Sequence, residues 1–109
     1  MTEDKKYSIL IVDDDKFLID MYNVKFSEKG FAVELASNGP EALQKIDNGL
    51  TPDIFLVDIV MPTMGGFELI QHIIQRQKEK RSAIVVLSNL GQKEDIEKSL
   101  ALGTDGYIV

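Results

Sequence analysis

Three carboxylates and one hydroxyl directly follow short apolar runs of this chain. Carboxylates that crowd together raise one another's pKa unless a cation neutralises them. Oxygen ligands suit a hard cation such as Mg²⁺, which typically takes one or two protein carboxylates, waters and a phosphate oxygen. The pattern therefore indicates a divalent-metal site beside a group that handles phosphate. The residues are Asp13 and Asp14 after Ile9–Val12, Asp58 after Ile54–Val57, and Ser88 after Ala83–Leu87.

Each of these side chains has an expected role in such a site. Asp14 and Asp58 are the candidate direct ligands of Mg²⁺, and Asp13 would act through water. The backbone carbonyl of Val60, just past Asp58, is a further candidate ligand. A carboxylate can also attack phosphorus and form an aspartyl phosphate, while the cation offsets the negative charge. Ser88 would then donate its hydroxyl to a phosphoryl oxygen.

The same residues also have ordinary structural explanations when they are taken singly. The run from Asp13 to Asp15 could form a solvated turn followed by a helix N-cap. Asp58 could cap the turn into the next helix, and Ser88 could be a turn residue. The joint pattern favours the metal site, because chance would have to place all four side chains at strand ends.

Five short runs rich in Val, Ile or Leu alternate with segments of helical spacing. Several runs are apolar without alternation, as in strands covered on both faces of a parallel sheet. The pattern predicts a βαβ series and an open, doubly wound α/β domain with helices on both faces. Functional residues of such sheets collect outside the carboxyl ends of the strands. The runs are Ile9–Val12, Ala32–Ala36, Ile54–Val57, Ala83–Leu87 and Tyr107–Val109.

The helical segments carry helix-start signals, and each has a stripe of mainly apolar residues that we expect to face the sheet. Asp15 is the predicted N-cap of the first helix, and Pro40 lies in the first turn of the second. Their inward stripes, and those of the third and fourth helices, follow three- and four-residue spacing. The stripes are Leu18, Met21, Tyr22, Lys25 and Phe26; Ala42, Leu43 and Ile46; Phe67, Ile70, Ile73, Ile74 and Gln77; and Ile96, Leu100 and Ala101.

Composition narrows the class of protein. The length of 109 residues predicts a single domain, and the net charge of −6 makes direct binding of nucleic acid or anionic membranes unfavourable. Cysteine is absent, which excludes disulfides and thiolate catalysis. The first apolar run is too short for a signal peptide or a membrane span. We therefore expect a cytoplasmic protein without membrane association.

Taken together, the motifs resemble response-regulator receiver domains of two-component systems. The stretches that carry the resemblance are Ile9-Leu-Ile-Val-Asp-Asp-Asp15, Pro52-Asp-Ile-Phe-Leu-Val-Asp-Ile-Val-Met-Pro62, Ser88, and Gly103-Thr-Asp-Gly-Tyr-Ile-Val109. The resemblance implies a flavodoxin-like, five-stranded parallel sheet of order 2-1-3-4-5. It also implies a signalling module that is not an enzyme beyond its own phosphorylation and slow dephosphorylation.

The resemblance also assigns roles to residues. Asp13 and Asp14 resemble the acidic pair that positions Mg²⁺, and Asp58 resembles the phosphoacceptor supplied by a sensor histidine kinase. Ser88 resembles the hydroxyl that moves toward the phosphoryl group. Tyr107 resembles the aromatic that then turns inward, although a plain edge-strand aromatic is the alternative.

The rest of the resemblance concerns loops and partners. Met61-Pro62 and Gly65-Gly66 resemble the loop after the phosphorylation site. The implied readout surface, for an output domain, an effector protein or a homodimer, is formed by the fourth helix and the fifth strand.

One part of the family pattern has no counterpart in this sequence. The family's lysine normally follows the fifth strand, directly after the position of Val109, and a fifth helix comes next. We therefore interpret residues 1–109 as a C-terminally incomplete receiver domain and expect the natural protein to continue. An uncovered strand would otherwise leave an apolar patch in water.

Two other functions compete with this interpretation. A Mg²⁺-dependent phosphohydrolase with an aspartyl nucleophile would use Asp-x-Asp after the first strand, which Asp13 and Asp15 could supply, but Asp58 would then be superfluous. A receiver-like interaction module that works without phosphorylation is the second alternative.

Overall fold

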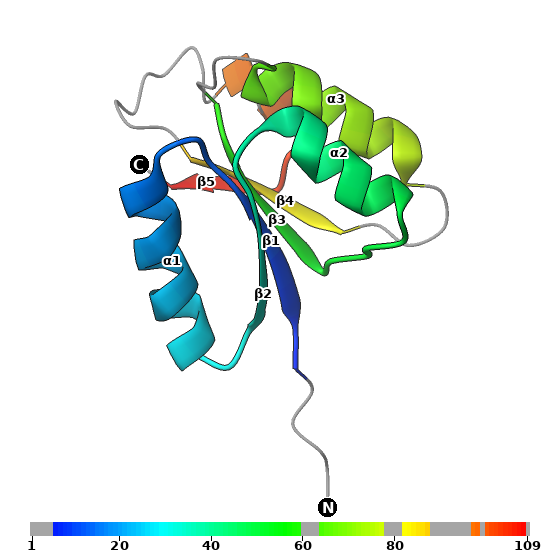
Figure 1. The fold of residues 1–109 in the computed structure, drawn as a ribbon. Helices are drawn as coiled ribbons and strands as arrows, with labels where there is room; N and C mark the ends of the chain where they lie inside the picture. The colour runs from blue at the N-terminus through cyan, green and yellow to red at the C-terminus, as the bar shows by residue number, and fades with distance from the viewer. Residues whose placement is uncertain (1–5, 60–63, 78–81, 88–96, 99, 109) are drawn as a thin grey trace, which may run out of the picture.

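The computed structural model describes residues 6–59, 64–77, 82–87, 97–98 and 100–108. Five parallel strands form one sheet of order β2-β1-β3-β4-β5. Figure 1 shows α1 on one face of this sheet and α2 and α3 on the other. The elements are β1 (Ser8–Val12), α1 (Lys16–Glu28), β2 (Ala32–Ala36), α2 (Gly39–Asp47), β3 (Ile54–Asp58), α3 (Gly66–Arg76), β4 (Ala83–Leu87) and β5 (Gly106–Ile108).

The predicted fold class and strand order are confirmed. Each predicted apolar run forms a strand within one residue of the expected bounds, and Val109, the end of the last run, lies outside the described residues. Residues 97–98 and 100–101 are helical, in the region where the fourth helix was expected, whereas Ile96 is not described. β5 is the last element within the described part of the chain.

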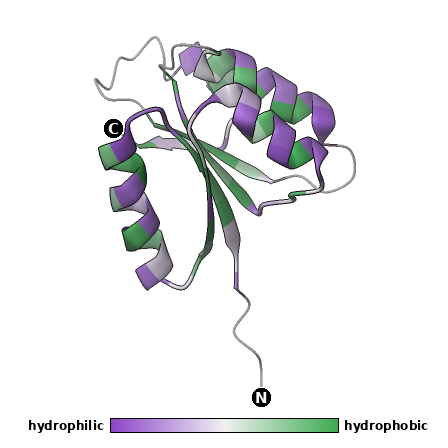
Figure 2. Cartoon of the chain, viewed as in Figure 1, coloured by the Kyte–Doolittle hydropathy of each residue, from purple (hydrophilic) through white to green (hydrophobic). Residues whose placement is uncertain are grey.

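Two hydrophobic cores lie on the two faces of the sheet. The core under α2 and α3 includes Leu10, Val12, Phe55, Leu69 and Ile70. The core under α1 is smaller and is centred on Ile9, Ile11, Ile19, Leu56 and Leu87. Residues of β1 alternate between the two cores because successive side chains of a strand point to opposite faces. Figure 2 shows the hydrophobic residues concentrated in the strands, whereas the helices carry both hydrophobic and hydrophilic residues.

α1 begins as predicted but presents a different face to the sheet. The Asp15 side chain caps the helix by accepting hydrogen bonds from the N–H groups of Phe17 and Leu18. Ile19 is the buried residue of this helix, whereas Met21 is half-exposed, so the predicted inward position of Met21 is wrong. The apolar residues of α1 itself are distributed around the whole helix, and therefore their spacing does not single out one face.

A polar link joins the entrances of β1 and β3. The Asp53 carboxylate accepts hydrogen bonds from the backbone N–H and the hydroxyl of Ser8, at 2.9 and 3.2 Å. The link holds these neighbouring strands in the register that pairs Val12 with Val57. Within the described residues, no helix is long and apolar enough to cross a membrane.

Candidate functional site

The predicted carboxylates converge at the carboxyl edge of the sheet. β1 and β3 are parallel neighbours, and the pairing of Val12 with Val57 places Asp13 beside Asp58. Asp58 is the last residue of β3 rather than the first residue after it. One ligand oxygen from each of Asp13, Asp14 and Asp58 lies within 4.8 Å of the other two. We call these three residues the acidic cluster.

Burial and mutual repulsion make it unfavourable for all carboxylates of the acidic cluster to be ionised without a cation. Asp13 and Asp58 are buried, with exposed fractions of 2% and 6%, whereas Asp14 is exposed. Burial raises the pKa of Asp13 above its ordinary value, and the charges of Asp14 and Asp15 raise it further. Hydrogen bonds from the Asp15 N–H and with Asp58 act in the opposite direction. A divalent cation among these oxygens would offset the repulsion, so the donor set fits Mg²⁺.

The three consecutive aspartates divide into different structural positions. The backbone N–H of Asp15 donates to Asp13 Oδ1 at 2.9 Å, which orients the Asp13 carboxylate. Asp15 Oδ1 is itself occupied by the first N–H groups of α1, at 2.9 and 3.3 Å. Asp15 is therefore a helix cap outside the acidic cluster, which argues against the Asp13/Asp15 pair of a phosphohydrolase.

A groove of about 320 Å³ adjoins the acidic cluster between the first turns of α1 and α2. Asp13 and Asp14 line one part of it, and Ile19 and Leu35 contribute apolar surface. Glu41 lines it as well, and its carboxylate accepts hydrogen bonds from the N–H and hydroxyl of Ser37, both at 2.8 Å. These bonds lower the pKa of Glu41, with the backbone N–H as the largest cause.

Gly66 supports the acidic cluster in a way that the sequence reasoning missed. It was assigned to a loop, but it is the first residue of α3. Its N–H donates to the carbonyl of Ile59 at 2.8 Å, and a Cβ at this position would collide with the backbone of Asp58 and Ile59. A glycine directly before a helical stripe was the available signal, because glycine allows close backbone approach.

Comparison with known proteins decides the family. The family model of the response regulator receiver domain matches residues 9–109. The chain belongs to this family. Receiver domains are signalling modules of two-component systems and are generally not enzymes.

Similar proteins include regulators of different lengths. The receiver domain is 35% identical over 101 residues to the Regulator of RpoS of Escherichia coli K12, a match that covers 93% of this chain but 29% of that relative. It is 31% identical over 100 residues to the chemotaxis protein CheY of Halobacterium salinarum, covering 92% of this chain and 81% of CheY. The chain therefore spans less than a third of the first of these relatives.

Solved structures share the whole fold of the receiver domain. CheY4 of Vibrio cholerae superposes with a TM-score of 0.88 at 28% identity, over 96% of this chain and 87% of CheY4. The CheX-CheY-BeF3-Mg²⁺ complex of Borrelia burgdorferi gives a TM-score of 0.84 at 28% identity, over 94% of this chain and 77% of that one. These matches establish the flavodoxin-like architecture of the receiver domain.

The remaining predicted site residues fall in two groups. Ser88 and Val60 lie outside the described residues of the receiver domain, as do Met61 and Pro62. Tyr107 lies in β5, at the edge of the sheet, with an exposed fraction of 47%. The structure therefore brings together Asp13, Asp14 and Asp58, and it places Tyr107 on the surface of the edge strand.

Proposed function

We propose that this receiver domain is a phosphoacceptor switch that takes a phosphoryl group from a sensor histidine kinase onto Asp58 with Mg²⁺. The observation that carries the proposal is the convergence of Asp13 and Asp14, which follow β1, with Asp58, which ends β3. One carboxylate oxygen from each residue lies within 4.8 Å of the other two. Capping and turn formation do not require such a convergence. The match to the receiver family supports the same conclusion.

The proposed chemistry uses the carboxylates at the end of β3 and just after β1. An Asp58 oxygen attacks the phosphorus of a phosphohistidine, so an O–P bond forms while the P–N bond to the imidazole breaks. Asp14, Asp58 and the Val60 carbonyl would hold Mg²⁺ directly, and Asp13 would hold it through water. The ion supplies positive charge against the carboxylates and the phosphoryl oxygens. Asp13 is oriented for its role by the Asp15 N–H.

The proposed output is a local rearrangement that the new charge at Asp58 drives. The Ser88 hydroxyl would move toward the phosphoryl group, and Tyr107 would turn inward from its exposed position. Tyr107 and Ile108 of β5 and Leu100 of the preceding helical segment are exposed apolar side chains, with exposed fractions between 41% and 47%. This surface supports binding of an output domain, an effector protein or a second copy of the domain.

Phosphorylation with acetyl phosphate and Mg²⁺ tests the proposal directly. We expect intact mass to show one added phosphoryl group on the wild-type domain and none on Asp58→Asn. Asp47→Asn is the matched control, because Asp47 is an exposed aspartate at the far end of α2, paired with Arg76. We expect this variant to be phosphorylated like the wild type.

Beryllofluoride, a mimic of the phosphoryl group, provides a second readout. With Mg²⁺ it should shift the amide NMR signals of Asp13 and Asp58 in the wild type but not in Asp58→Asn. If wild type and Asp58→Asn respond alike in both assays, Asp58 is not the acceptor. If the wild type does not respond in either, the domain is an interaction module that works without phosphorylation.

A further inference from the structure

A second pocket lies at the opposite end of the sheet from the acidic cluster. It has a volume of about 220 Å³ and lies between the ends of α2 and α3 and the segment that enters β3. Phe55 lines it near the start of β3, three residues before Asp58. A strand rises roughly 3.3 Å per residue, so the backbones of these two residues are about 10 Å apart. The pocket is thus separate from the proposed phosphorylation site.

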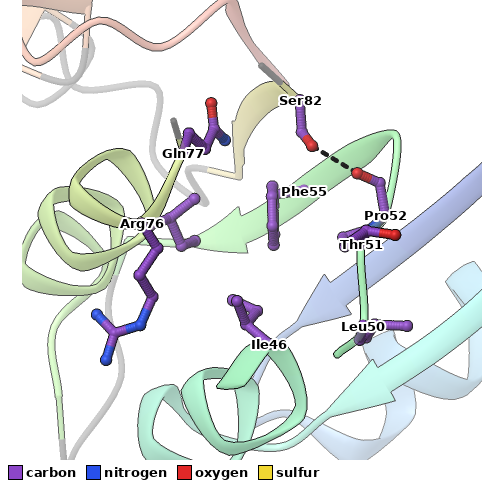
Figure 3. Close-up of a pocket in the computed structure, with 9 residues that line it drawn as sticks. Ile46, Leu50, Thr51, Pro52, Phe55, Arg76, Gln77 and Ser82 are labelled. Carbon is purple, nitrogen blue, oxygen red and sulfur yellow. Dashed lines mark hydrogen bonds between the residues drawn. The ribbon is translucent and has the colours of Figure 1, made fainter. Parts of the chain in front are cut away.

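The walls of this pocket combine apolar and polar surface in about equal parts. Ile46 of α2, Ile73 of α3, Phe55 of β3 and Leu50 from the connecting segment contribute apolar surface, and polar groups form about half of the exposed wall. Figure 3 shows Arg76 and Gln77, at the end of α3, across the Phe55 ring from the segment that contains Leu50, Thr51 and Pro52. Small-molecule sites likewise combine apolar walls with placed polar groups that orient the ligand.

The charged group at the pocket is already neutralised. The Arg76 guanidinium pairs with Asp47, with Nε 2.9 Å from Oδ1, and donates to the backbone carbonyl of His72 at 3.2 Å. The Ser82 hydroxyl is also engaged, since it donates to the carbonyl of Pro52. Among the described lining residues, no other side chain carries a formal charge, so the pocket favours a neutral ligand.

Gln77 supplies an unused donor at the same place. Its Nε2 is shielded from solvent and has no hydrogen-bond partner among the described residues. A buried donor without a partner is costly, and therefore an acceptor that pairs with it gains free energy. The terminal torsion of a glutamine side chain is soft, so the carboxamide can rotate toward a molecule in the pocket.

We propose that this pocket binds a small neutral molecule with an aromatic or branched aliphatic body and one hydrogen-bond acceptor, which pairs with the Gln77 amide. An apolar cavity of roughly 150 Å³ holds benzene, so a pocket of about 220 Å³ admits a ring with a short substituent. The proposal goes beyond the phosphoacceptor function and does not depend on it.

Two probes of nearly the same shape test the pairing. Acetophenone has a phenyl ring and one carbonyl acceptor, and cumene replaces the carbonyl oxygen with a methyl group. Titration followed by amide NMR shifts should show saturable binding of acetophenone, with the largest shifts at Leu50, Phe55 and Gln77. Cumene should bind about fivefold more weakly, as expected for the loss of one hydrogen bond.

Two substitutions at the end of α3 distinguish the contribution of the Gln77 amide to binding from that of the apolar walls. Gln77→Leu should reduce acetophenone affinity to that of cumene and leave cumene affinity unchanged. Gln75→Leu is the matched control, because Gln75 lies two residues earlier, in the last turn of α3, and is exposed, so it should change neither affinity. The proposal is overturned if acetophenone does not saturate, if its shifts map elsewhere, or if both probes bind equally to the wild type. The last comparison needs no variant and holds even where Gln77→Leu does not fold.

Discussion

The backbone of Gly66 lies against the carbonyl group of Asp58 so closely that no side chain fits between them. The N–H of Gly66 donates to the next carbonyl along, that of Ile59, at 2.8 Å. The first turn of α3 therefore rests on the backbone of the proposed phosphoacceptor. Any change that pushes this turn away also displaces the end of β3, where the acidic cluster is formed.

Gly66→Ala should therefore destabilise the domain. The added Cβ would lie 2.6 Å from the Cα of Ile59 and would also meet the Asp58 carbonyl, so backbone must shift. We expect the free energy of unfolding in urea to fall by about 1–3 kcal/mol, as for overpacking elsewhere. Gly65→Ala is the control, since a Cβ there meets nothing within 4 Å. Equal stabilities of the two variants would contradict the close approach.

Asp13→Asn should stabilise the metal-free domain at neutral pH. The folded-state pKa of Asp13 is raised, chiefly by burial, so the folded domain holds this proton more tightly than the unfolded chain. Stability is consequently lost as the pH rises from about 3.8 through the raised pKa. Asparagine removes this loss and can keep the hydrogen bond from the Asp15 N–H.

Thermal unfolding in EDTA across this pH range checks the prediction. The melting temperature of Asp13→Asn should exceed that of the wild type at pH 7, and the difference should shrink in acid. Mg²⁺ should reverse the order by stabilising the wild type more, by about 2.7 kcal/mol at a hundred times its Kd. Asp20→Asn, which changes an exposed acid of α1, is the control. A wild type that is the more stable protein without metal would show that burial of Asp13 is not costly.

The convergence of the acidic cluster could be predicted from sequence because it follows from topology. Asp13 and Asp58 each end a short apolar run, and the carboxyl ends of adjacent parallel strands lie at one edge of a sheet. Nothing beyond strand order and an approximate register was needed. An error of one residue in the end of β3 did not matter, because the side chain of Asp58 still reaches this edge.

Features that depend on three-dimensional distances could not be predicted in this way. The inward face of α1 was ambiguous because apolar residues surround that helix, and packing against the sheet selected Ile19 over Met21. The role of Gly66 depends on its distance from Asp58, which no local pattern encodes. The division of tasks between Asp13 and Asp15 likewise depends on where α1 begins.

Glu41→Gln should lower stability at neutral pH and flatten its acid dependence. The Glu41 carboxylate accepts two hydrogen bonds from Ser37, which lower its folded pKa below 4.5. A lowered carboxyl pKa contributes stability above the unfolded value, and this contribution is lost as the pH falls through the folded value. Because solvent screens the site, we expect about 0.5 kcal/mol at pH 7.

Glu68→Gln provides the control for this experiment. Glu68 occupies the same third position of α3 that Glu41 occupies in α2, but the partner of its carboxylate is the His72 imidazole, with Nε2 3.9 Å from Oε2. Urea unfolding at pH 7 and pH 3 should show the Glu41→Gln loss only at pH 7. If Glu41→Gln and Glu68→Gln behave alike, the Ser37 hydrogen bonds do not stabilise the first turn of α2.

Thr104→Val should raise the stability of the domain. Thr104 is buried just before β5, and among the described residues no group hydrogen-bonds to its hydroxyl. A buried hydroxyl without a partner costs free energy, and valine has nearly the same shape without the polar atom. We expect an increase of about 1 kcal/mol in the free energy of unfolding. Thr51→Val, at an exposed threonine, should change stability much less. A loss of stability in Thr104→Val would mean that the hydroxyl has a partner in solution, such as a buried water, and that valine removes this bond.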